Sequence, residues 1–165
     1  MTLAIRSATA GDRAAIRAVE EEAFGRDDEA NLVDKLVAVG DGTLELVAER
    51  DGRIVGHVLF TRLFVDGPDG RFGAVALAPL AVAPEAQRTG VGTALVEEAH
   101  RMLQEAGETL SVVLGEPDYY GRFGYEHSRA ASFDCDWQGE ALQALAWGSA
   151  PVAGRLVYAP AFTEL

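Results

Sequence analysis

The sequence predicts a mixed α/β sheet fold, and three observations predict it. The dipeptide Asp51-Gly52, between two strand-like segments, is typical of a two-residue hairpin turn. The nearly continuous apolar run at 72–82 is typical of a central strand that is buried on both faces. Helices and strands alternate along the chain after this hairpin start, which favours a sheet of mixed direction.

The first half of the chain predicts a strand, two helices and the hairpin. Thr9, with Asp12 three residues later, resembles a capping box that opens a helix. Ile16, Val19 and Ala23 then fall on one face of that helix. In order, the segments are a strand at 3–7, a helix from the capping box through Phe24, a helix at 28–39 that ends at Gly40, and strands at 43–49 and 53–65.

The second half predicts the buried strand, a long helix and several short elements. Pro79 interrupts the apolar strand, and because proline cannot donate to a sheet ladder, it marks a bulge or the place where two strands separate. The remaining segments are a helix at 90–106 that stops at Gly107, a strand at 110–114, a short helix at 119–123, a strand that begins at Tyr125, a helix at 139–147 and a strand at 155–158.

The composition restricts the class of protein. The 165 residues suit one domain, 1–165, with a core at 3–128 and a C-terminal part at 129–165. The 26 acidic and 14 basic residues give a net charge of −12, which disfavours binding to nucleic acid. Cys135 is the single cysteine, no Cys/His cluster has metal-site spacing, and no apolar stretch has membrane-spanning length. We therefore expect a cytoplasmic protein with no metal, nucleic-acid or membrane partner.

The segment at 87–93 predicts an anion site, because it follows the end of the buried strand at 82 after a short loop, and its two glycines open a long helix; the alternative is a plain glycine turn before a helix. The first amides of a helix lack intrahelical partners, and the helix dipole adds positive charge at that end. Gly90 and Gly92 let a phosphate approach the backbone, and Arg88 adds a forked cationic contact. A P-loop is disfavoured because the only lysine is Lys35, and a Rossmann fingerprint is disfavoured because Leu95 stands where a small residue is needed.

Two motifs in this order resemble one family. Gln87-Arg88-Thr89-Gly90-Val91-Gly92, preceded by Val82-x-Pro84, is similar to the Gln/Arg-x-x-Gly-x-Gly/Ala signature of the GNAT superfamily of N-acetyltransferases. The segment from Tyr119 to Tyr125 is similar to the family's Tyr-x-x-x-Gly-Phe/Tyr element. The residue pattern at 114–125, together with that of the tail at 157–162, resembles a bacterial branch of predicted acetyltransferases.

The resemblance implies a GNAT fold, with a central mixed sheet that splays at a bulge and helices on both faces. It also implies acetyl-CoA as co-substrate, with no metal. The backbone of three residues would bind the pantetheine arm and the acetyl group: Leu80, Ala81 and Val82. The pyrophosphate would bind at Gln87, Arg88, Thr89, Gly90, Val91, Gly92 and Thr93.

Tyr120 is the catalytic candidate that the resemblance implies. It stands four residues before Gly124, where the family's tyrosine hydroxyl often protonates the departing CoA thiolate. A thiol pKa of about 8.5 makes the thiolate a fair leaving group, and a phenol within hydrogen-bond reach can assist it. The alternative is an amphipathic tyrosine of the core. Tyr119, Phe123 and Tyr125 are expected to serve in packing.

No residue stands out as the general base. Many relatives carry a glutamate in the central strand, but 72–82 contains no acid and no histidine. The candidates that stay open are Glu116, Glu22, His57 and a chain of water molecules, and each of these side chains also fits a structural role.

The resemblance therefore implies an acetyl-CoA-dependent N-acetyltransferase, in which a primary amine attacks the thioester directly. The alternative is a non-catalytic acyl-CoA-binding or sensing domain of the same fold. The resemblance places the first two helices beside the acceptor entrance, so the acidic run at 20–29 favours a small cationic amine, either a small molecule or a peptide; the alternative for this run is a solvated helix end. A homodimer stays open, because dimers are common among relatives.

Overall fold

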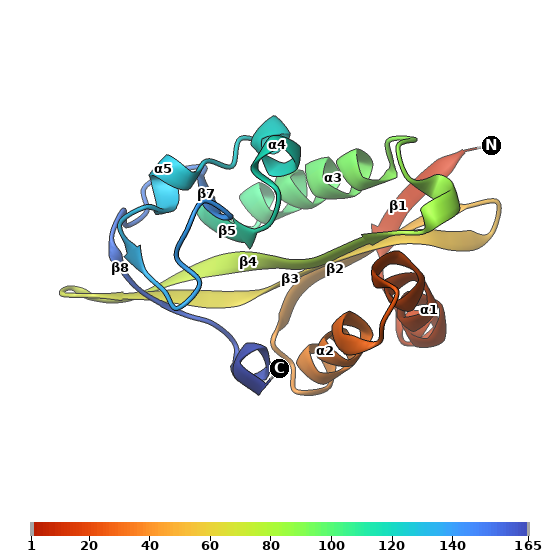
Figure 1. Cartoon of the computed structure of the whole chain (residues 1–165), viewed down its shortest axis with the longest axis horizontal. Helices are drawn as coiled ribbons and strands as arrows, with labels where there is room; N and C mark the ends of the chain where they lie inside the picture. Colours follow the sequence, from red (N-terminus) through yellow and green to blue (C-terminus); the bar gives the residue numbers. More distant parts are fainter. Residues whose placement is uncertain (1, 165) are drawn as a thin grey trace.

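The computed structural model describes residues 2–164 and shows a mixed sheet with helices on both faces (Figure 1). The strand order is β1-β2-β3-β4-β5-β7, and β8 pairs with β3 and with β6. Neighbouring strands from β1 to β4 are antiparallel, β4 and β5 are parallel, and β5 and β7 are antiparallel. The strands are β1 (Leu3–Ser7), β2 (Gly42–Arg50), β3 (Arg53–Gly67), β4 (Gly70–Val82), β5 (Leu110–Leu114), β6 (Phe133–Asp134), β7 (Leu142–Ala146) and β8 (Gly154–Val157).

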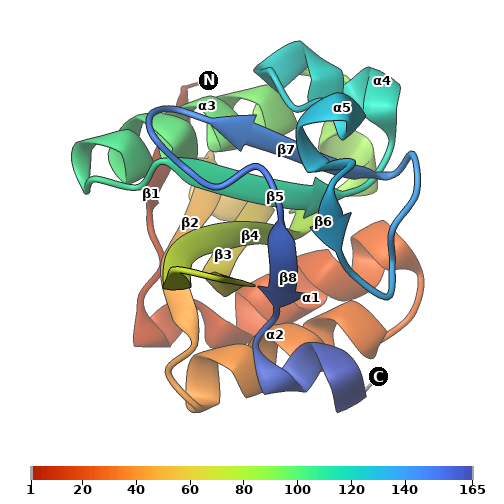
Figure 2. The same ribbon diagram turned by 90° about the vertical axis from the view of Figure 1, so that its left-hand side faces the viewer.

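The helices form two layers around this sheet. The α-helices are α1 (Arg13–Phe24), α2 (Asp28–Ala38), α3 (Val91–Glu105), α4 (Pro117–Tyr120) and α5 (His127–Ala130). Short 3-10 turns lie at η1 (Ala10–Asp12), η2 (Pro84–Ala86), η3 (Gly121–Phe123) and η4 (Pro160–Glu164). The long helix α3 covers one face, while α1, α2 and the C-terminal turn cover the other (Figures 1 and 2). None of the helices in residues 2–164 is long and apolar enough to cross a membrane.

Strand β3 contributes side chains to the hydrophobic clusters on both faces of the sheet, because its side chains alternate between the two faces. Val58 and Phe60 pack in the cluster beneath α3, and Leu59 packs in the cluster beneath α1 and α2. Gly56 lets α3 approach closely, since a Cβ there would come within 2.7 Å of the Val91 side chain. The first turn of α3 therefore rests directly on the sheet, which fixes where its open amides lie.

The predicted break at Pro79 is confirmed. The parallel pairing of β4 with β5 ends at Leu77 and Val113, although β4 continues along β3 to Val82. At the break, β4 has two residues, Ala78 and Pro79, where β3 has one, so the register shifts as in a β-bulge. The gap between β4 and β5 opens from this point.

Two predicted elements in the C-terminal part are wrong. Residues 139–147 do not form a helix but contain β7, although their Ala, Leu and Gln residues favour helix locally. Pairing with β5 and burial of Leu142 and Ala144 override that local preference. The strand expected from Tyr125 is reduced to one bridge between Glu126 and Ala144, because the His127 ring donates to the Leu142 carbonyl (2.9 Å) and the chain turns into α5.

A buried polar chain ties α3 to β5. The Tyr125 hydroxyl hydrogen-bonds to His100 Nε2 of α3 (2.9 Å) and to Ser111 Oγ of β5 (2.7 Å). The His100 ring also packs edge-on against Trp147, with the ring centroids 5.0 Å apart. Burial lowers the pKa of His100 to about 4, from an ordinary value of 6.5, so the imidazole is neutral at neutral pH.

We expect this histidine to make the protein sensitive to acid. As the pH falls from 7 to 4, the unfolded chain takes up a proton at His100 before the folded chain does, and the free energy of unfolding falls by about 3 kcal/mol through this group alone. Urea unfolding at several pH values measures the loss. In His100→Gln this part of the pH dependence should disappear, and an unchanged slope between pH 7 and 4 would contradict the prediction.

Candidate active site

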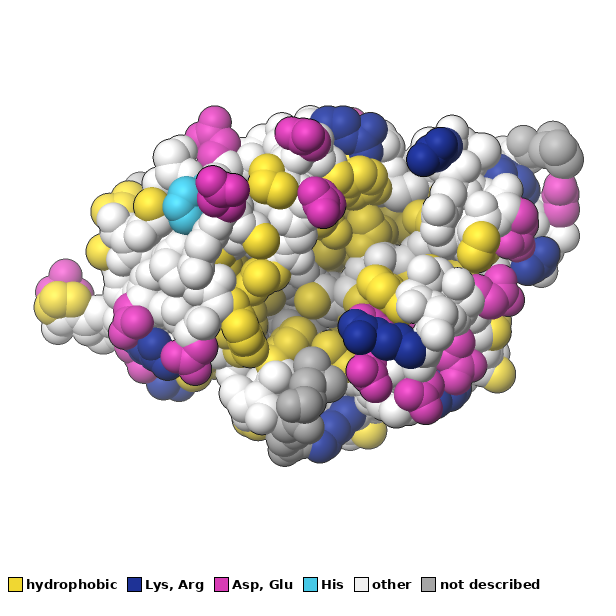
Figure 3. All heavy atoms as spheres, viewed as in Figure 1, with side chains coloured by type: hydrophobic (Ala, Val, Ile, Leu, Met, Phe, Trp, Pro, Cys, Tyr) yellow, Lys and Arg dark blue, Asp and Glu magenta, His cyan; other side chains and the backbone are white. Residues whose placement is uncertain are grey.

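A cavity of about 780 Å³ lies where β4 and β5 separate. Figure 3 shows it as a hollow lined with hydrophobic side chains in the middle of one face. Its walls come from the far end of β4, the end of β5, α4, the corner between α1 and α2, and the C-terminal segment (137–162). The predicted residues that border it are Leu80, Val82, Gln87, Arg88, Glu116 and Tyr120.

The open edge of β4 carries backbone groups without a strand partner. The Ala83 amide donates to the Val55 carbonyl of β3 (2.8 Å), and alternate residues of a strand direct their polar groups to opposite edges. Leu80 and Val82 therefore direct their amides and carbonyls to the gap, whereas those of Ala81 face β3. Of the three residues predicted along this edge, Leu80 and Val82 present their backbone to the cavity.

The loop before α3 holds an unusual backbone shape. Arg88 has a φ of 64° and Gly90 a φ of 92°, and the left-handed region is unfavourable for a residue with a Cβ such as Arg88. The Gln87 side chain donates from Nε2 to the Val82 carbonyl (3.1 Å), and the Thr89 hydroxyl donates to the Ala86 carbonyl (2.5 Å). Both side chains thus brace the loop. The first hydrogen bond of α3 runs from the Ala94 amide to the Gly90 carbonyl. The backbone amides of 91–93 therefore have no partner within the helix, as at the start of any helix.

Two glycines make room for the neighbouring tyrosines of α4. A Cβ on Gly115 would overlap the Tyr120 ring, and a Cβ on Gly92 would overlap the Tyr119 hydroxyl. The sequence predicted that Gly92 serves the approach of a phosphate; in the structure it also admits Tyr119. Burial raises the pKa of Tyr120 well above its ordinary value, so its hydroxyl stays protonated at neutral pH.

The three side chains considered as general base lie in different places. Glu116 borders the cavity and is exposed. Glu22 borders a different cavity, between α1 and the β2–β3 hairpin, and lies 3.9 Å from Arg53. His57 is fully buried, away from the lining of the main cavity. Only Glu116 of the three is therefore placed to reach a substrate there.

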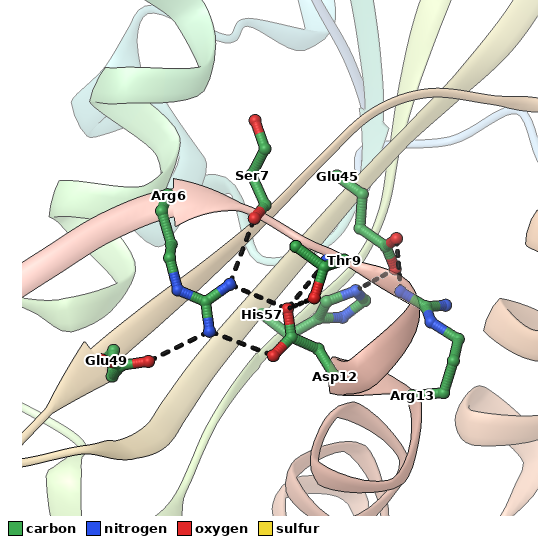
Figure 4. A network of polar contacts seen from close by, with 8 residues as sticks. All are labelled: Arg6, Ser7, Thr9, Asp12, Arg13, Glu45, Glu49 and His57. Carbon is green, nitrogen blue, oxygen red and sulfur yellow. Dashed lines mark hydrogen bonds and ion pairs between the residues drawn. The ribbon is translucent and has the colours of Figure 1, made fainter.

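His57 belongs to a buried charge network (Figure 4). Its Nδ1 lies 2.7 Å from a Glu20 carboxylate oxygen, and its Nε2 lies 2.7 Å from a Glu45 oxygen. Arg13 in turn forms an ion pair with Glu45. Burial opposes a charge on His57, but the hydrogen bonds that the ring donates to the Glu20 and Glu45 carboxylates outweigh it and raise the pKa of the imidazole. The network fastens α1 to β2 and β3, which is a structural role.

Comparisons with known proteins agree with this geometry. The family model described as "Acetyltransferase (GNAT) domain" matches residues 4–128. The chain belongs to the GNAT family of acetyltransferases. It is 38% identical over 129 residues to the N-acetyltransferase YhbS of Escherichia coli (strain K12), over 78% of this chain and 76% of that protein.

Two solved structures show the same fold over nearly the whole chain. The crystal structure of E. coli YhbS in complex with CoA matches with a TM-score of 0.90 and 34% identity, over 98% of this chain and 92% of that one. A GNAT family acetyltransferase from Brucella melitensis, in complex with acetyl-CoA, matches with a TM-score of 0.83 and 34% identity, over 98% of both chains. The expected GNAT fold and class of enzyme are thus confirmed, while the roles of single residues stay predictions.

Sequence reasoning missed one wall of this GNAT protein's cavity. Trp137, Tyr158 and Phe162 line it from the C-terminal part of the chain (129–165), and no site was predicted at any of the three. Their one signal is an aromatic-rich tail, which does not reveal where the tail folds back. The acidic run also divides: Glu29 borders the cavity, whereas Glu20 is fully buried beside His57.

The close contact of Gly115 with Tyr120 gives a direct test of the site. Gly115→Ala should lower the free energy of unfolding by about 1–3 kcal/mol, because the added methyl group displaces the Tyr120 ring. Gly121→Ala is the matched control, since a Cβ there meets nothing within 4 Å. Urea denaturation compares the two variants, and equal stability would show that the Tyr120 ring does not lie where the structure places it.

Proposed function

We propose that this protein transfers an acetyl group from acetyl-CoA to the primary amine of a small acceptor, by direct attack of the amine on the thioester. The observation that carries the proposal is the gap between β4 and β5, where open backbone, a strained loop and Tyr120 border one cavity. The solved structures of E. coli YhbS and of the Brucella protein, which contain CoA and acetyl-CoA, support it.

In this proposal the chain's own backbone holds the coenzyme. The amides of Leu80 and Val82 and the carbonyl of Leu80, which point to the gap, would hydrogen-bond the pantetheine arm, while Ala81 pairs with β3 and holds this edge in place. The loop from Gln87 to Thr93 would bind the pyrophosphate through open amides and Arg88. Because the net charge of −12 repels a polyanion at long range, binding must come from these local contacts.

Two side chains would handle the protons of the reaction. When bound, acetyl-CoA supplies the acetyl group as an activated thioester. As the C–N bond forms and the C–S bond breaks, Tyr120 would donate its retained proton to the departing sulfur. The acceptor ammonium loses two protons in all. Glu116, directly or through water, would accept the first, which frees the amine for attack; the second, released as the C–N bond forms, would pass through water to the Tyr120 oxygen and restore its hydroxyl. Glu22 and His57 lie outside the cavity and are not assigned this role.

The proposal treats residues 1–165 as one acetyltransferase domain that needs no metal. We still predict a cytoplasmic location and no nucleic-acid or membrane partner. A homodimer stays open as the oligomeric state.

Replacing Tyr120 with Phe tests the proposed chemistry. Tyr120→Phe should lower kcat by about 10- to 1,000-fold while the Kd for acetyl-CoA stays within about threefold, because only the proton donor is lost. The measurements are the release of free CoA with a panel of amines and calorimetric titration with acetyl-CoA. Tyr119→Phe is the matched control and should keep its kcat. An unchanged kcat in Tyr120→Phe would remove this hydroxyl from the mechanism.

Other outcomes would separate the proposal from its alternative. Binding of acetyl-CoA without turnover of any amine would favour a non-catalytic acyl-CoA-binding or sensing domain, which the lack of an acid or histidine in β4 also suggests. Failure to bind acetyl-CoA would contradict both functions.

A further inference from the structure

The cavity gathers apolar side chains that are otherwise rare on the surface. Five large hydrophobic side chains are exposed among the described residues, and three of them line this cavity: Phe24, Leu114 and Trp137, at 40%, 44% and 40% exposure. Single exposed hydrophobic residues are ordinary, but a group in one hollow indicates a ligand that covers them. They stand at the α1–α2 corner, at the end of β5 and in the C-terminal segment.

Aromatic rings form a rigid wall at this end of the cavity. Trp137 and Tyr158 meet edge to face, with centroids 4.9 Å apart, and Tyr158 meets Phe162 in the same way at 5.6 Å. Leu32 of α2 borders the same space. Edge-to-face contacts hold such rings in fixed positions, so the wall offers a preformed surface to a flat or branched apolar group.

The charges around this wall are mainly negative. The Glu116 carboxylate makes no hydrogen bond or ion pair with any residue in 2–164, and it also borders a neighbouring cavity of about 460 Å³ that Glu140 lines. Glu29 is held by Arg26 through two hydrogen bonds of 3.0 and 2.6 Å. The one basic residue of the lining is Arg88, which belongs to the loop before α3. The rim therefore offers one carboxylate without a partner, which suits a single ammonium group.

We propose that the acceptor is a small monoamine carried on an aromatic or branched aliphatic body. The body packs between Phe24 and the Trp137–Tyr158 wall, and the Glu116 carboxylate attracts the ammonium group. This inference rests on the proposed function, which identifies the cavity as the acceptor site. It narrows the class of acceptor from any small cationic amine to one whose amine is carried on an apolar body. A hydroxylated amine would leave these apolar walls in contact with water.

Three small molecules separate the two contributions to binding. 2-Phenylethylamine has both the apolar body and the charge, ethanolamine has only the charge, and 2-phenylethanol has only the body. With CoA present, calorimetry should give a Kd for 2-phenylethylamine about tenfold or more below that for ethanolamine, because the phenyl ring is buried. Its Kd should also be about two- to fivefold below that for 2-phenylethanol, because the ion pair with Glu116 is partly exposed to water.

Variants show which residues cause each difference in Kd, the apolar walls at Phe24 and Trp137 or the carboxylate of Glu116. Trp137→Ala, and independently Phe24→Ala, should remove most of the preference for 2-phenylethylamine over ethanolamine, and Glu116→Gln should remove the preference for the amine over the alcohol. Val152→Ala is the matched control, since it removes an exposed hydrophobic side chain outside the lining of this cavity. An unchanged Kd for CoA shows that each variant keeps its fold.

The outcomes distinguish this inference from the proposed function. Equal affinity for 2-phenylethylamine and ethanolamine, or an equal loss for both in Trp137→Ala and in Phe24→Ala, overturns the inference even if amines are acetylated. Selective binding of 2-phenylethylamine without its acetylation supports the inference as a statement about the cavity and counts against the proposed function.

Discussion

Strand β4 runs on from Ala78 to Val82 after its parallel partner has ended, and the site depends on this separation. A strand inside a sheet normally satisfies its amides and carbonyls on both edges, and buried groups left unpaired are unfavourable. Here the bulge at Pro79 ends the pairing with β5, while pairing with β3 continues. The result is a strand edge that faces a cavity, and a ligand with its own amide groups can complete that edge.

The separation is useful only if both sides of the gap are held in place. On one face, Gly56 seats the first turn of α3 on β3, and the chain from His100 through Tyr125 to Ser111 ties α3 to β5. On the other face, His57 between Glu20 and Glu45 fastens α1 to the sheet. Removing one partner of such a buried charged group leaves the others uncompensated, at a cost of about 3–5 kcal/mol. The cavity thus lies between two rigid layers.

The elements that local rules define were predictable from the sequence, and those that depend on distant pairing were not. Pro79 and Asp51-Gly52 act on their own backbone, so the bulge and the hairpin turn could be located directly. Residues 139–147 carry helix-forming side chains, and only the free edge of β5 makes them a strand. The GNAT motifs placed the loop and Tyr120 beside the gap. No local pattern indicated that Trp137 would reach the cavity, because the return of the C-terminal segment is set by tertiary packing.

The central claim is that the coenzyme lies in the gap between β4 and β5 and against the loop before α3. Amide hydrogen exchange, measured by mass spectrometry with and without acetyl-CoA, tests it most directly, because open backbone amides exchange quickly and bound ones slowly. The account predicts slower exchange in peptides that cover 78–93, with little change in the β2–β3 hairpin. Saturating acetyl-CoA that leaves exchange in 78–93 unchanged, while it protects another region, would contradict it.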